Sequence, residues 1–210
     1  MIKNYKKQIG ISTLVILIPL AAGLLLWDQL PEQIPIHFDA HGTPNGWSGK
    51  LFAVVGFPLM MAAIHLFTCM IVLNDPKKQN IGNKMRNIVF MIIPVISCFS
   101  SFAIYAIALG HSVNVTDVMN ILIGVMFLVF GNYMTKNHQN YTVGIRLPWT
   151  LHSEENWNKT HRFASKLWIA GGIIMIAGVF LNIEWLMVLV ILILAFVPMI
   201  YSFILYKKGI

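Results

Sequence analysis

The chain has 210 residues, of which 57% are hydrophobic and only 11% are charged. Soluble domains carry about a quarter charged residues, so this composition excludes a water-soluble globule and predicts a polytopic membrane protein. The net charge of +7 would favour nucleic-acid binding in a soluble chain, but the basic residues here lie between long apolar segments, so we expect no direct contact with nucleic acid.

Six apolar segments approach the length of about 20 residues that a helix needs to cross the hydrocarbon layer of a bilayer. They predict an all-α fold with six transmembrane helices, the last two joined by a tight turn at Glu184. The segments are residues 9–27, 51–73, 88–109, 119–133, 167–183 and 185–206.

The positions of the basic residues predict the orientation of the chain, because positively charged loops resist translocation. All of the fifteen Lys and Arg residues except Lys50 fall in the loops on one side, whereas the opposite loops are acidic. Both termini are therefore expected in the cytoplasm. We divide the chain into residues 1–73, with two spans and an extracellular loop at 28–50, residues 74–134, with spans three and four, and residues 135–210, with a cytoplasmic loop and spans five and six.

The extracellular loop is predicted to be an ordered cap without helix. Pro31, Pro35 and Pro44 exclude a regular helix, and several glycines between Pro35 and Lys50 permit tight turns. Trp47 favours a position of the loop against the membrane surface, where indole rings concentrate.

Within this loop, His37, Asp39 and His41 alternate, so in an extended segment the three side chains would share one face. Two imidazoles and a carboxylate can hold zinc or copper, but the sequence names no further ligand. The favoured interpretation is that His37 and Asp39 form hydrogen bonds within a Pro-rich turn, and we assign no metal.

The cytoplasmic loop at residues 135–166 divides into an extended part through Pro148 and a helical part after Ser153. As an N-cap, the Ser153 hydroxyl can accept a backbone N–H that the first helical turn leaves unpaired. Glu155 can pair with Lys159 one turn further on. The sequence therefore predicts a helix that starts at this serine.

The helical part of the loop carries two indoles and an imidazole on one face. This pattern predicts a short interfacial helix that leads into the fifth span. Membrane anchoring alone does not need so many aromatic, hydroxyl and basic groups, so we expect a binding role for the loop. The residues of the face are Trp157, His161, Ala164 and Trp168.

One ionisable side chain, His65, lies near the middle of the second span. A polar group at that depth is costly unless it has a partner. The third span presents Ser97, Ser101 and Tyr105 on one face. We therefore predict a structural hydrogen bond from His65 to one of these residues rather than a proton or ligand site.

Two motifs, one in each loop, carry a resemblance to a known family. The outer pattern L-P-x-x-I-P-I-H-F, followed by G-x-P-x-G-W-x-x-K, resembles the short domain at the start of the bacterial SdpI immunity-protein family. The inner pattern G-I-R-x-P-W-T-L, followed by S-E-x-x-W-x-x-T-H-R, is similar to the C-terminal signature of that family. Together with six spans, the resemblance covers essentially the whole chain.

The resemblance implies a multi-pass protein of the Gram-positive plasma membrane, surrounded by membrane lipid, that protects its producer from a secreted antimicrobial peptide toxin. It also implies a second partner, a cytoplasmic transcriptional repressor that the protein holds at the membrane and thereby keeps from repressing. It implies no enzyme activity, catalytic residue, metal or cofactor.

The motif positions carry these roles over to this chain residue by residue. Contact with the toxin or another ligand falls to the outer residues Leu30, Pro31, Pro35, His37, Phe38, Gly42, Pro44 and Lys50. Contact with the repressor or another partner falls to the inner residues Gly144, Arg146, Pro148, Trp149, Thr150, Trp157, Thr160, His161 and Arg162. Leu147 stands where the family pattern has Thr, which removes a hydroxyl and bears on partner specificity more than on the fold.

Three other functions remain open on the residues alone. One is a paralogue of the same family with a role in envelope stress. Another is a membrane-interface enzyme with His161 or His37 as general base beside Glu154 or Asp39, although no nucleophile elbow, phosphate loop or H-E-x-x-H motif supports it. A small transporter is disfavoured, because the chain shows no internal repeat and no series of intramembrane carboxylates.

Overall fold

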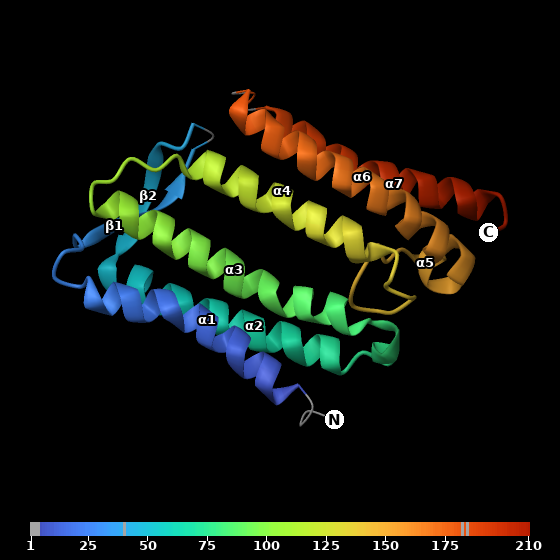
Figure 1. Ribbon diagram of the computed structural model, residues 1–210, viewed down its shortest axis with the longest axis horizontal. Helices are drawn as coiled ribbons and strands as arrows, with labels where there is room; N and C mark the ends of the chain where they lie inside the picture. Colours follow the sequence, from blue (N-terminus) through green and yellow to red (C-terminus); the bar gives the residue numbers. More distant parts are fainter. Residues whose placement is uncertain (1–4, 40, 182, 184) are drawn as a thin grey trace. The chain divides into compact units, whose positions relative to one another are not determined.

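The computed structural model describes residues 5–39, 41–181, 183 and 185–210, and Figure 1 draws its helices and strands. Among these residues it contains seven α-helices and one pair of antiparallel strands. The helices are α1 (Lys6–Leu25), α2 (Phe57–Leu73), α3 (Asn83–Ala108), α4 (Val115–Met134), α5 (Pro148–His152), α6 (Glu154–Phe180) and α7 (Leu186–Lys207). The strands are β1 (Gln33–Phe38) and β2 (Pro44–Gly49). The all-α prediction is confirmed, with a small hairpin added to it.

Six helices among the described residues are long and apolar enough to cross a membrane. They are α1, α2 with the π-helical segment Phe52–Gly56 before it, α3, α4, α6 and α7. Large apolar side chains stay exposed on them, as Phe196 and Ile200 of α7 do at 54% and 58%. Water penalises such surface and lipid chains do not. The chain is therefore a multi-pass membrane protein, and the cytoplasmic position of both termini stays a prediction.

The fifth span and the helix predicted before it form one continuous helix. The apolar pattern places it near residue 167, whereas α6 begins at Glu154 and continues without a break to Phe180. No proline separates the amphipathic part from the apolar part, and a helix that has been nucleated propagates at low cost. One helix therefore runs from the loop that carries the inner motif into the span.

The chain divides into two compact units, which we describe separately. The first unit contains residues 1–70 and 89–116, with α1, the hairpin and parts of α2 and α3. The second unit contains residues 71–88 and 117–210, with most of α4 and all of α5, α6 and α7.

The core of the first unit lies where β1 meets the ends of the helices. Its buried members are Leu30, Ile34, Ala53, Val54, Ile104 and Tyr105. A Cβ atom at Gly23 would lie 2.7 Å from Cγ1 of Val54 and 2.8 Å from the Tyr105 hydroxyl. Only a glycine at this position lets α1 approach so closely. The hairpin is fixed to this core through Ile34, whose side chain is completely buried.

The intramembrane His65 has a partner on a different helix from the one predicted. Its Nε2 lies 2.9 Å from the hydroxyl of Ser12 on α1, and both residues are buried. The same hydroxyl lies 2.9 and 3.0 Å from the carbonyls of Gln8 and Ile9 on its own helix. The prediction that His65 forms a hydrogen bond with another helix is confirmed. The prediction that its partner is Ser97, Ser101 or Tyr105 is wrong.

In the second unit, α6 and α7 form the predicted hairpin and run side by side (Figure 1). The Trp168 indole N–H donates to the carbonyl of Leu194 at 3.1 Å, and Met175 and Val190 are buried beside it. Glu184, which the sequence predicts to mark the turn, lies outside the described residues.

Glycine also lets α6 pack closely against α4. A Cβ atom at Gly172 would lie 2.6 Å from the carbonyl oxygen of Gly124, and one at Gly124 would lie 3.0 Å from the carbonyl of Gly172. Small residues permit this approach of two backbones, which is a common source of helix association in membranes. Dense packing at this point therefore depends on both glycines.

We expect Gly172→Ala to lower the free energy of unfolding by about 1–3 kcal/mol, because an added methyl must push two backbones apart. Gly10→Ala on α1 is the matched control, since nothing lies within 4 Å of its Cβ position and alanine favours a helix by about 0.5–1 kcal/mol. Thermal unfolding in detergent micelles measures both. Equal melting temperatures for the two variants would contradict the close approach.

Candidate functional site

The inner signature loop, residues 135–153, is held by side-chain amides in place of a long helix or a strand. Asn140 is completely buried, and its Oδ1 accepts the N–H groups of Thr142 and Val143 at 3.0 and 2.7 Å. Its Nδ2 donates to the carbonyls of His138 and Val143. Asn137 donates to Val143 as well, at 2.7 Å. These amides supply the partners that backbone groups need in a buried turn.

A short helix, α5, follows the turn and corrects the prediction of an extended chain through Pro148 with helix only after Ser153. Pro148 opens α5, which suits proline because the first helical N–H has no partner inside the helix. The Thr150 hydroxyl accepts the N–H of Leu147 at 2.8 Å and donates to the carbonyl of Ile145 at 2.9 Å. The start of α5 is therefore fixed by two motif residues, Pro148 and Thr150.

The start of α6 agrees with the prediction. The Ser153 hydroxyl accepts the N–H of Asn156 at 3.1 Å, and Glu155 pairs with Lys159 at 2.7 Å. The prediction of an interfacial face on this helix is wrong, however, because Trp157 and His161 are buried at 0% and 1% exposure. The face packs against the signature loop, whose backbone offers hydrogen-bond partners at fixed positions that the membrane interface does not provide.

The contacts of Trp157 and His161 define the centre of the site. The Trp157 indole N–H donates to the carbonyl of Asn137 at 2.9 Å, and its ring stacks on the imidazole with centroids 4.0 Å apart. His161 Nε2 lies 3.0 Å from the N–H of Ile145, which can only donate, so Nε2 carries no proton. Nδ1 therefore bears the proton and donates to the carbonyl of Trp157 at 2.8 Å. This imidazole is neutral and both its nitrogens are bonded to the backbone.

Gly144 shows why the signature needs glycine before its arginine. Its φ of +124° belongs to the left-handed half of conformational space, which side chains disfavour. A Cβ atom there would also lie 2.5 Å from His161 Nε2 and 3.0 Å from the Trp157 ring. The glycine thus lets the loop backbone reach the imidazole.

A second buried network joins α5, α6 and α7. Asn156 Oδ1 accepts the hydroxyls of Thr160 and Ser202 at 3.1 and 2.8 Å, and its Nδ2 donates to the carbonyl of Ser202. The Trp149 indole N–H donates to the Ser202 hydroxyl at 2.6 Å. The motif residues Trp149 and Thr160 therefore serve the packing of the helices. Asn156 and Ser202 were missed by the sequence analysis, although Asn156 stands one helical turn before Thr160.

The connection between α2 and α3 contributes further residues that the motifs do not contain. Asp75 is 2% exposed, and its Oδ2 accepts the N–H of Tyr141 at 2.9 Å and the hydroxyl of Thr142 at 2.7 Å. Its Oδ1 accepts the N–H of Lys77 at 2.7 Å. Asp75 thus holds the signature loop from its far side. A lone acid beside Pro76 gave no sequence signal of this role.

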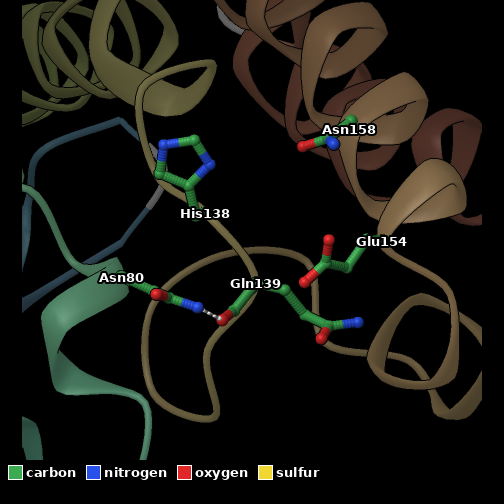
Figure 2. Close-up of a pocket in the computed structure, with 5 residues that line it drawn as sticks. All are labelled: Asn80, His138, Gln139, Glu154 and Asn158. Atoms are coloured by element: carbon green, nitrogen blue, oxygen red, sulfur yellow. Dashed lines mark hydrogen bonds between the residues drawn. The ribbon is translucent and has the colours of Figure 1, made fainter.

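A small polar pocket of about 150 Å³ lies beside the loop, lined by Asn80, His138, Gln139, Glu154 and Asn158 (Figure 2). Asn80 Nδ2 donates to the carbonyl of Gln139 at 2.7 Å. The Gln139 amide in turn donates to the carbonyls of Thr150 and Leu151 at the end of α5. No three His, Cys, Asp or Glu side chains among the residues described in this structure are grouped as metal ligands. Two of the lining residues, Asn80 and Gln139, join the loop to the connection between α2 and α3 and to α5.

The outer loop is a β-hairpin, so the prediction of an ordered cap without helix holds for it. His37 Nδ1 donates to Asn45 Oδ1, and Asp39 Oδ1 accepts the N–H groups of His41 and Thr43, each at 2.9 Å. The favoured interpretation of His37 and Asp39 as residues of a hydrogen-bonded turn is confirmed. Across the described part of the loop, His37, Asp39 and His41 form no three-ligand metal group.

The outer motif residues divide into buried and accessible ones. Leu30 and Pro35 are buried, and Lys50 is only 8% exposed. The Lys50 ammonium pairs with Glu32 at 2.9 Å and donates to the carbonyl of Trp27 at 3.2 Å, which ties the hairpin to the end of α1. The other motif residues are partly or fully exposed, namely Pro31, His37, Phe38, Gly42 and Pro44.

The inner motif residues divide in the same way. Thr150, Trp157, Thr160 and His161 are buried in the two networks, and Trp149 is partly buried. The exposed members are Gly144, Arg146, Pro148 and Arg162. Arg146 donates to the carbonyl of Tyr141 at 2.7 Å, which keeps its guanidinium near the turn. Of the inner motif residues, the two arginines combine charge with accessibility.

Comparison with known proteins agrees with both motifs. Residues 136–202 match the SdpI/YfhL protein family, and residues 14–62 match a domain of unknown function, DUF1648. The chain is 27% identical over 206 residues to "Immunity protein SdpI" of Bacillus subtilis (strain 168), and the alignment covers 97% of each chain. No solved structure matches the chain. The resemblance drawn from the two loops is confirmed, and the similarity to a protein of that name supports an immunity role.

We expect His161→Ala to lower the free energy of unfolding by about 1–3 kcal/mol, because the N–H of Ile145 would lose its partner inside the protein. His138→Ala removes an exposed imidazole from the same loop and should change stability little. Thermal unfolding of both variants in micelles, followed by tryptophan fluorescence, measures the difference. If both variants have the melting temperature of the wild type, the network around His161 does not stabilise the loop.

Proposed function

We propose that this chain, which carries the SdpI/YfhL signature in residues 136–202, is an immunity protein that protects its producer from a secreted peptide toxin. The observation that carries the proposal is the alignment with a protein named for immunity over almost the whole of both chains. The alignment includes both loops, so the relative has a segment that corresponds to the hairpin and one that corresponds to the inner signature.

In this proposal the toxin meets the outer hairpin. Leu30, Pro35 and Lys50 anchor the hairpin, which leaves His37 and Trp47 exposed on an ordered scaffold. An exposed indole is a common anchor in protein interfaces because it buries much apolar area with little loss of freedom. The accessible motif residues are thus the candidates for toxin contact.

The inner loop would contact a cytoplasmic repressor through its arginines. The buried residues of the signature are already engaged within the protein, so Arg146 and Arg162 are the motif cations left to meet a partner. A guanidinium can form paired hydrogen bonds with a carboxylate, which suits it to specific protein contacts. Resistance and signalling would then use different loops.

The geometry favours this non-enzymatic role over a membrane-interface enzyme. Both nitrogens of His161 are bonded to backbone groups, so the ring has no free site with which to take a proton from a substrate. His37 is bonded to the amide of Asn45 and not to a carboxylate that could orient a base. The matched relative is named for immunity and not for catalysis.

Expression of this chain should raise the survival of a sensitive Gram-positive strain challenged with the toxin to which the Bacillus subtilis relative gives immunity. His37→Ala should weaken protection, because it removes an exposed ring and the hydrogen bond between the imidazole and the Asn45 side chain. Dose–response curves with membrane levels checked by immunoblot measure this. Sensitivity equal to that of the empty vector, despite normal insertion, would refute the immunity proposal.

Arg162→Ala should abolish partner signalling and leave toxin resistance intact, because the side chain is exposed and lies outside the two buried networks described above. Lys166→Ala, an exposed cation on the same helix outside the motif, is the matched control for charge. A reporter fused to the promoter controlled by the repressor measures signalling. Loss of both resistance and signalling at normal protein levels would show that the two functions are not separable.

A further inference from the structure

The outer hairpin has two strands and therefore two edges, and its register shows which backbone groups lie on each. The N–H of Lys50 donates to the carbonyl of Glu32 at 3.0 Å, and Ile34 lies opposite Ser48. Hydrogen-bonded and non-bonded pairs alternate along an antiparallel ladder. The backbone groups of Ser48 thus face β1, and those of its neighbours face away from it.

The free edge of β1 is closed to another strand. Pro35, opposite Trp47, has no N–H to donate, and its position in the ladder directs its nitrogen outward. Ile34 and Pro35 are also buried, and Ile34 belongs to the core of the first unit. Natural sheets use proline and burial in this way to prevent unwanted pairing.

The free edge of β2 is open. By the same alternation, the N–H and C=O groups of Trp47 and Gly49 point away from β1. Within the described part of the chain, neither N–H forms a backbone hydrogen bond beyond the strand pair. Trp47 is 56% exposed, and nothing lies within 4 Å of the Cβ position of Gly49. The Gly49 carbonyl also accepts the Ser48 hydroxyl, at 3.4 Å. This edge therefore offers an added strand two outward N–H groups beside an exposed indole.

We propose that the free edge of β2 binds an extended segment of the secreted peptide as a third strand. This inference rests on the proposed function and specifies how the hairpin takes its ligand. The backbone of the peptide would pair with Trp47 and Gly49, and the indole of Trp47 would cover one of its side chains. The outer loop carries three carboxylates, those of Asp28, Glu32 and Asp39, and one ammonium, that of Lys50, which is paired with Glu32. This charge favours a cationic or neutral segment over an acidic one.

The matched variants Gly49→Pro and Gly49→Ala test the edge. Both add atoms where the structure has open space, but only proline removes the outward N–H. We expect Gly49→Pro to weaken binding of the toxin peptide about three- to tenfold, the value of one hydrogen bond, and Gly49→Ala to bind as the wild type does. Affinity is measured on full-length protein in nanodiscs with the synthetic toxin used in the survival assay.

A second measurement leaves the protein unchanged and so does not depend on the folding of a variant. Toxin peptides that are N-methylated at one amide each, scanned along the chain, should lose affinity at every second position of one segment. Carbonyls of that segment labelled with ¹³C should show an amide I band of β-sheet only in the complex. Affinity loss without a two-residue period would overturn strand addition.

The outcomes separate this inference from the proposed function. Wild-type protection with equal affinity for both Gly49 variants would overturn the edge site and leave the immunity role standing. Absence of both protection and peptide binding by the wild type would overturn both. Cross-linking of two copies through Trp47→Cys, with no peptide effect, would assign the edge to self-association and would likewise overturn the proposal.

Discussion

The hydrogen bond from the indole of Trp157 to the carbonyl of Asn137 is the contact on which the inner signature loop depends. A buried N–H or C=O without a partner costs a large share of the small net stability of a folded protein. The bond fixes the first turn of α6 against the signature loop and brings His161 within reach of Ile145. With these two bonds formed, the side chains of Asn137 and Asn140 supply partners for further backbone groups of the loop.

The two loops differ in how their backbone N–H and C=O groups find hydrogen-bond partners. The outer hairpin satisfies its backbone through strand pairing and anchors itself through a buried ammonium at Lys50. The inner loop has no strand partner in the described structure and relies on amide side chains, of which Asn140 alone satisfies four backbone groups. In both loops the motif combines residues that build the scaffold with a few that stay exposed. A signature that resembles one binding surface is therefore largely a set of folding determinants.

The helices could be predicted from the sequence because long apolar runs leave a chain no other stable form in a bilayer. The partner of His65 could not, since the pattern of α3 shows which residues share a face but not which helix that face meets. The prediction that Trp157 and His161 lie at the membrane surface failed for the same reason, because their spacing shows that they share a face but not that this face packs against the loop. The fold of residues 137–147 escaped prediction because its polar side chains bond to the backbone of the loop itself, and a run such as Asn137 to Asn140 resembles any solvated loop.

The carboxylate of Asp75 has a consequence for how the inner signature loop can move. On one side of the loop, Asp75 accepts the N–H of Tyr141 and the hydroxyl of Thr142. On the side that faces α6, His161 and Trp157 form hydrogen bonds with the loop backbone. A local opening would have to release both sides together, so fluctuations of this segment are coupled to the unfolding of α6. We therefore expect this stretch with little regular structure to exchange its amide hydrogens as slowly as the helices that it joins, and to resist cleavage by proteases.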